Sequence, residues 1–153
     1  MKRGLALLTL LVMLLPAARL EAASNPVINV NTVGLELCPQ SICGAAIFTG
    51  FLFGQVGTNP AAIGTFAVAV MHESPLPGPL QTKLITGGVF EFRVGLRRIR
   101  GVVAEGTLFN NGDNTFDVDA VLVITSGGSG TLNYHGLLDH NVFPPTVVGP
   151  VTQ

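Results

Sequence analysis

The 153-residue sequence has no tryptophan, one tyrosine and two cysteines, and only 11% of its residues are charged. The two cysteines, in Cys38-Pro-Gln-Ser-Ile-Cys43, do not have the two-residue spacing of a C-x-x-C redox motif. A zinc site would need further thiols or paired histidines, which the sequence does not supply. A G-x-S-x-G motif for a serine nucleophile is also missing. We therefore expect no bound metal and no cofactor.

Long apolar runs are scarce as well. The run over residues 5–15 is too short to span a bilayer, which requires about 20 apolar residues. Lys2 and Arg3 precede it, and Glu21-Ala-Ala-Ser24 follows it. This order is typical of a secretory signal. We predict a signal peptide over residues 1–23 and a secreted or periplasmic product with no stable membrane insertion. An uncleaved membrane tether is the alternative.

Basic residues are too few for a broad positive surface. Loss of residues 1–23 would leave five basic and eight acidic residues, a net charge of −3. Nucleic-acid binding requires a wide positive field that displaces counterions. Most of the remaining cations lie in one short stretch, at Arg93, Arg97, Arg98 and Arg100. We expect no nucleic-acid partner.

Helical periodicity is absent after the signal, and a period of two takes its place. In residues 115–125 the alternating apolar side chains share one face, while Asp117 and Asp119 lie on the other, which is typical of a strand. The preceding Asn110-Asn-Gly-Asp113 contains an Asn-Gly pair that favours a tight turn. Residues 97–125 are therefore predicted to form a hairpin. Further strands are expected at 26–37, 45–56, 63–72, 81–86, 88–94 and 130–139.

Short strands separated by turn signals every ten or so residues predict an all-β fold. Glycines inside the strands, such as Gly50, Gly64 and Gly106, favour a small closed barrel, which needs sharp bends at its corners. We predict one antiparallel eight-stranded barrel over residues 24–142, followed by a proline-containing tail over 143–153. A β-sandwich is the alternative.

Several of these segments resemble a known family. Gly87-Gly-Val-Phe-Glu-Phe92, Gly101-Val-Val-Ala-Glu-Gly-Thr107 and Ile124-Thr-Ser-Gly-Gly-Ser-Gly-Thr-Leu-Asn-Tyr-His-Gly136 are similar to the strand-and-glycine pattern of allene oxide cyclase and dirigent barrels. The resemblance covers residues 87–136 and implies an eight-stranded barrel with an apolar cavity. It carries over no catalytic residue.

An even number of cysteines in an exported chain favours a disulfide. We therefore predict that Cys38 and Cys43 are bonded and pin a turn between the first strands. Reduced structural thiols are the alternative.

His135 and Asp139 are the sharpest catalytic candidates. In a strand they share a face, so they can present a base and an acid to one space, while His140 faces the other way. The alternative places Asp139 and His140 in solvent at the end of the strand.

The aromatic residues on predicted strands are the ligand-binding candidates, because small barrels either fill their interiors with such side chains or leave a cavity lined by them. These are Phe66, Phe90, Phe92, Phe116 and Tyr134. We expect a secreted, non-enzymatic barrel that is structural or binds a small apolar ligand. A cyclase-like or dirigent-like enzyme that confines an apolar substrate is the alternative. Both faces of residues 45–56 are apolar, which suggests a homo-oligomer.

Overall fold

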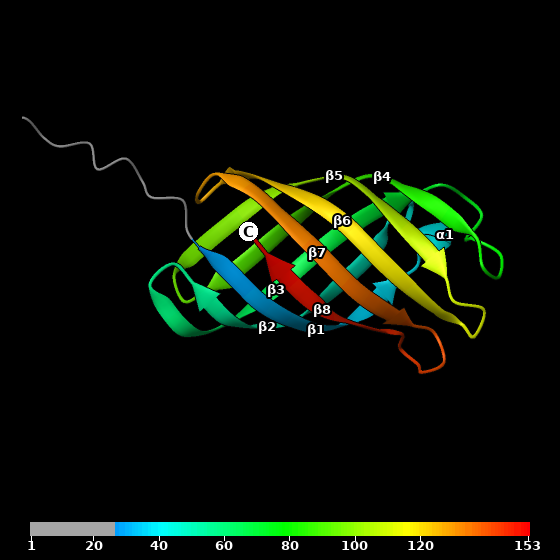
Figure 1. The fold of residues 1–153 in the computed structure, drawn as a ribbon, viewed down its shortest axis with the longest axis horizontal. Coiled ribbons are helices and arrows are strands. Elements are labelled where there is room, and N and C mark those ends of the chain that lie inside the picture. The colour runs from blue at the N-terminus through cyan, green and yellow to red at the C-terminus, as the bar shows by residue number, and fades with distance from the viewer. Residues whose placement is uncertain (1–26) are drawn as a thin grey trace, which may run out of the picture.

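The structure is a computed structural model that describes residues 27–153, so the predicted signal peptide lies outside the described residues. Eight antiparallel strands form a closed barrel in which each strand pairs with the next and β8 pairs with β1 (Figure 1). The strands are β1 (Ile28–Cys38), β2 (Ala46–Val56), β3 (Asn59–His72), β4 (Thr82–Val94), β5 (Arg97–Asn110), β6 (Thr115–Ser126), β7 (Gly130–Asp139) and β8 (Thr146–Thr152). The predicted barrel is confirmed, and the sandwich alternative is wrong.

The short helix α1 (Gln40–Cys43) connects β1 and β2 at one end of the barrel. We call this the α1 end. The turns that join β2 to β3, β4 to β5 and β6 to β7 lie at the opposite end. No helix among residues 27–153 has the length and apolar character needed to cross a membrane.

The break predicted between residues 86 and 88 is absent. Residues 81–86 and 88–94 form the single strand β4, because Gly87, at φ 153°, forms an irregularity in the pairing with β3 and lets the strand continue. The predicted hairpin over 97–125 is confirmed as β5 and β6, with positive φ at Gly112 and Asn114 in the connecting loop.

The predicted tail over 143–153 is wrong for most of its length, because residues 146–152 form β8 and close the barrel. Val147 and Val151 are buried in the interior, as the inward positions of a strand require. Pro150 is tolerated because the pairing with β7 skips positions 149 and 150, while the pairing with β1 places Pro150 opposite Asn31.

The interior is densely packed at the end opposite α1. The largest fully buried side chains that do not line the cavity gather there, on four strands: Ile28, Val30, Leu52, Ile99 and Leu132. Burial of each such side chain stabilises the fold by about 1.5–3 kcal/mol. This end is the part of the barrel on which folding stability depends most.

The packed end yields a stability prediction. Leu132→Ala removes a side chain that is 0% exposed, so we expect the free energy of unfolding to fall by about 2–5 kcal/mol. Leu96→Ala is the matched control, because Leu96 is fully exposed in the β4–β5 turn and its truncation leaves stability within about 0.5 kcal/mol. Denaturant unfolding followed by circular dichroism measures both. A loss below about 1 kcal/mol for Leu132→Ala would contradict a packed end.

Candidate functional site: a cavity at the α1 end of the barrel

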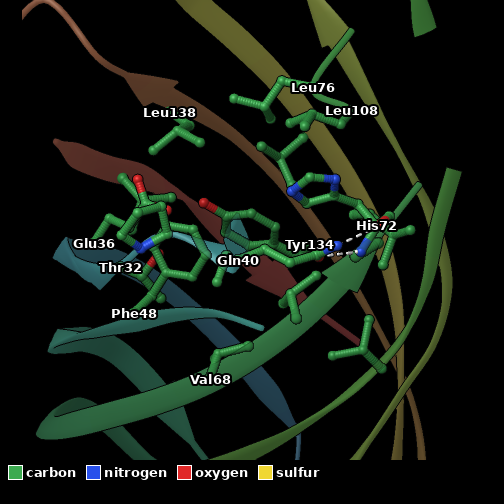
Figure 2. A pocket seen from close by; sticks show the side chains of 18 of the residues that line it. Thr32, Glu36, Gln40, Phe48, Val68, His72, Leu76, Leu108, Tyr134 and Leu138 are labelled. Atoms are coloured by element: carbon green, nitrogen blue, oxygen red, sulfur yellow. Dashed lines mark hydrogen bonds between the residues drawn. The ribbon is translucent and has the colours of Figure 1, made fainter. Parts of the chain in front are cut away.

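The interior is hollow toward the α1 end. A cavity of about 470 Å³ extends from the middle of the barrel to this end, with walls that are mainly aliphatic and aromatic. Its walls include inward side chains of all eight strands, among them Phe48, Phe66, Val68, Val118 and Leu138. Figure 2 shows Phe48, Val68, Leu108 and Leu138 around this space. The volume falls in the range of about 300–1,000 Å³ that is typical of small-molecule sites.

Small residues at inward positions help to keep this half of the barrel open. Ala46 and Ala120 line the cavity, and Gly34 and Gly136 occupy inward positions on β1 and β7. Gly34 is required by the ring of Phe66, because a Cβ at position 34 would lie 2.5 Å from Phe66 Cζ. The ring therefore lies directly against the backbone of β1.

Helix α1 is held at the mouth of the cavity by two attachments. The predicted disulfide between Cys38 and Cys43 is present and joins the end of β1 to the end of α1. Gln40 attaches α1 to the end of β3, since its side-chain amide donates to the His72 carbonyl at 2.8 Å and accepts from the His72 N–H at 2.7 Å. Pro39, Gln40 and Ser41 consequently form part of the cavity lining.

The loop between β3 and β4 forms the next part of the mouth, because it begins directly after His72, to which α1 is attached. Asn110, at the end of β5, is 9% exposed and donates from its side chain to the Pro77 carbonyl at 2.8 Å. Its backbone carbonyl also accepts from the Leu80 N–H. These bonds fold the loop against the barrel, so that Pro75 and Leu76 line the cavity. Leu76 is 42% exposed and lies at the rim.

Glu36 and His140 form the main polar feature of the cavity wall. The Glu36 side chain is 6% exposed, and its Oε2 lies 3.1 Å from His140 Nε2. The two atoms are at ion-pair distance but not aligned for a hydrogen bond, so Nε2 is buried without a hydrogen-bond partner. The His140 ring packs against Phe116, with ring centroids 5.1 Å apart. A buried acid and a partly buried base therefore lie side by side at the α1 end.

Tyr134 is the second polar group inside the cavity. Its ring extends over Gly136, where a Cβ would lie 2.0 Å from the hydroxyl oxygen. In Figure 2 the hydroxyl points toward the side of the cavity on which Glu36 and Thr32 lie. Burial raises the pKa of Tyr134 to about 12, and the neighbouring Thr32 hydroxyl opposes this only in part. Thr32 donates its hydroxyl hydrogen to the Gly149 carbonyl at 2.8 Å, so the Tyr134 oxygen lies beside Thr32 without an aligned hydrogen bond within residues 27–153.

The predicted ligand-binding aromatics divide into two groups. Phe66, Phe92 and Tyr134 line the cavity. Phe90 and Phe116 are buried in the core but do not line it: Phe90 packs against Phe92, with centroids 4.9 Å apart, and Phe116 supports His140.

The predicted catalytic pair lies on the outside of the barrel. His135 is exposed, and its Nδ1 lies 2.6 Å from Asp119 Oδ1 on β6. The hydrogen bond to Asp119, with its negative charge, raises the pKa of His135 above the usual 6.5. The Asp139 carboxylate instead accepts from the Asn141 N–H at 2.8 Å. The structure therefore gives His135 and Asp139 different partners, neither of them in the cavity.

The sequence reasoning missed Glu36 and attached no role to His140. A signal for Glu36 exists, because it falls on the same alternating positions as the buried Ile28, Val30 and Thr32. An acidic residue at an inward position of a barrel strand is a candidate for a ligand-binding or catalytic residue. Its pairing with His140 could not be read in this way, because the two residues are far apart in the sequence.

Across the described part of the chain, no three His, Cys, Asp or Glu side chains converge as a set of metal ligands. Comparisons with protein-family models, with curated proteins and with solved structures find no match to this chain. The eight-stranded antiparallel barrel is established, and the likeness to allene oxide cyclase and dirigent proteins remains a resemblance in the pattern of strands and glycines.

The buried phenol generates a prediction about high pH. The chain has one tyrosine and no tryptophan, so tyrosinate absorbance reports on Tyr134 alone. We expect native protein to titrate near pH 12, whereas denatured protein titrates near the ordinary value of about 10. Because the folded-state pKa is the higher one, the stability that neutral Tyr134 contributes is complete below pH about 10 and is lost as the pH rises toward about 12. A native midpoint near 10 would contradict a buried hydroxyl.

Proposed function

We propose that this protein binds a small, elongated apolar molecule inside the barrel. The observation that carries the proposal is the cavity of about 470 Å³, which has largely apolar walls and a mouth at the α1 end. Binding of an apolar ligand in a cavity of this size is favourable, because the ligand removes apolar protein surface from contact with water. Helix α1 and Leu76 at the mouth support entry of the ligand from this end.

We also propose that the protein acts outside the cytoplasm. The disulfide between Cys38 and Cys43 supports this location, because such bonds persist in oxidising compartments. The signal-like order of charged, apolar and small residues near the N-terminus supports it as well.

A second candidate function is a cyclase-like or dirigent-like enzyme that confines an apolar substrate and directs ring closure or coupling. The proximity of Glu36 and His140 favours it, because an acid and a base beside an apolar cavity can move a proton within a bound substrate. Confinement itself contributes to such catalysis by fixing the geometry of the reacting atoms. Incubation with an apolar compound, followed by extraction, chromatography and NMR, separates the two candidates: a carrier returns the compound with unchanged structure, and an enzyme releases a rearranged product.

Binding is tested with N-phenyl-1-naphthylamine, a neutral apolar dye that fluoresces on leaving water. We expect Val68→Phe to weaken dye binding by about tenfold or more, or about 1.4 kcal/mol, because the larger side chain fills the cavity. Val89→Phe is the control, since Val89 is 58% exposed on the outer face of the neighbouring β4. Circular dichroism verifies that both variants fold. Equal dye binding by both variants, or none by the wild type, would contradict the proposal.

The expected homo-oligomer has a suitable surface on the outer wall of β8, β1, β2 and β3. The outward positions of these strands carry no charged residue, and Val33, Phe51, Phe53, Ile63 and Val148 are each at least 40% exposed there. The pairing registers place Val33 beside both Phe51 and Val148. Four strands of about ten residues cover roughly 600 Å², which approaches the 800 Å² or so that each partner contributes to a stable interface. We propose that a second copy of the chain covers this wall.

Light scattering coupled to size exclusion tests this contact. We expect the wild type to show the mass of a dimer, and Phe51→Glu to show that of a monomer, because the substitution places a charge in the apolar contact. Val102→Glu adds the same charge on the outer face of β5, where Val102 is 40% exposed, and should leave the dimer intact. A monomeric wild type, or a Phe51→Glu dimer of unchanged strength, would contradict the proposal.

A further inference from the structure

The polar groups of the cavity differ in what they can offer to a ligand. The hydroxyl of Tyr134 and Nε2 of His140 are both fully covered by protein atoms. Glu36 lines the cavity, and its carboxylate accepts no hydrogen bond from the described residues beyond the misaligned approach of His140. Glu36 is therefore the carboxylate that can accept a hydrogen bond from a ligand at this end, where Thr32, Gln40, Ser41, His72 and Ser74 also line the cavity.

Glu36 is the only acidic residue that lines the cavity within residues 27–153, and no lysine or arginine of this part of the chain belongs to the lining. The basic side chains of the lining are His72 and His140, and His140 Nε2 lies 3.1 Å from the Glu36 carboxylate. A buried carboxylate that lacks aligned donors is costly, and the cost falls when a donor approaches it. An anionic head group would instead meet the Glu36 carboxylate in a medium of low dielectric constant, and His140 Nε2 is covered by protein atoms and cannot contact the head group.

The position of Glu36 sets the direction in which a ligand would lie. Glu36 is near the end of β1 beside α1, whereas Phe66 and Leu122 line the cavity further toward the packed end. An apolar tail would extend toward these residues, and the polar head would remain near the mouth.

From this arrangement, and resting on the proposed binding function, we infer that the ligand carries a hydrogen-bond-donating head group, an ammonium or a hydroxyl, which Glu36 receives at the α1 end. The same arrangement rejects ligands that end in a carboxylate. The cavity thus selects amines or alcohols with an apolar tail over fatty acids of the same length.

Displacement of bound N-phenyl-1-naphthylamine by decylamine, decanol and decanoate, each below its micelle-forming concentration at neutral pH, tests the inference. These competitors share one chain length and differ in the head group. We expect the amine, the alcohol or both to displace the dye at concentrations about tenfold lower than decanoate, as an unpaired buried charge predicts. Comparison of decylamine with decanol shows whether the cavity recognises a positive charge or a neutral hydrogen-bond donor. Decanoate that displaces the dye as well as either of them would overturn the inference.

The variant Glu36→Gln tests whether Glu36 causes the preference for the amine and the alcohol over decanoate. We expect the variant to lose most of the discrimination against decanoate, measured as the ratio of the decylamine and decanoate concentrations that displace the dye from that same variant. Glu105→Gln, on the exposed outer face of β5, removes the same charge from the protein and should keep the discrimination. A preference that survives in Glu36→Gln would overturn the inference even where the dye binds. If Glu36→Gln does not fold, native mass spectrometry of the wild type with decylamine and with decanoate gives the same comparison. Failure of the proposed function has a different signature, because the wild type would then not bind the dye at all.

Discussion

Closure of the sheet by the pairing of β8 with β1 is the constraint on which the rest of this structure depends. Once eight strands close, the interior has a limited width, and the size of the inward side chains decides whether it is filled or hollow. At the end opposite α1, the inward positions carry branched aliphatic residues such as Leu52, Ile99 and Leu132, and the interior is filled. Toward α1, glycine and alanine take several of these positions, and a cavity remains.

This division separates stability from binding within one small barrel. The packed end buries enough apolar surface to support the fold, so the other half is free to leave space and to carry polar groups. The disulfide and the two hydrogen bonds of Gln40 hold α1 beside the opening, and Asn110 holds the β3–β4 loop. The mouth is therefore built from segments that are attached to strand ends. Glu36 and His140 lie where these segments meet the cavity.

The alternation of apolar residues was sufficient to predict the barrel and the β5–β6 hairpin, because one face of each strand must be buried. The same rule failed at β8, since Pro150 and the preceding prolines resembled a tail, and only the skipped pairing with β7 explains why a strand tolerates them. Gly87 was read as a break between two strands, although a glycine irregularity within β4 accounts for it. Local sequence does not distinguish a bulge from a turn when both require glycine.

Only part of the cavity lining could be predicted from the sequence, because the cavity depends on contacts between different strands. Phe66, Phe92 and Tyr134 were identifiable as aromatic residues on strands, and they line the cavity. Whether the barrel was hollow could not be read from the sequence, because it depends on how rings such as Phe66 lie against Gly34 on another strand. The pairing of Glu36 with His140 is likewise created by barrel closure, which brings the end of β1 beside the segment that follows β7.

A crystal structure determined under xenon pressure tests the central claim most directly, because xenon enters apolar cavities that are large enough to hold it. We expect xenon inside the barrel near Phe66, Val68 and Val118, and none between Ile28, Leu52 and Leu132 at the packed end. An interior without xenon, with side chains filling the space at the α1 end, would contradict it.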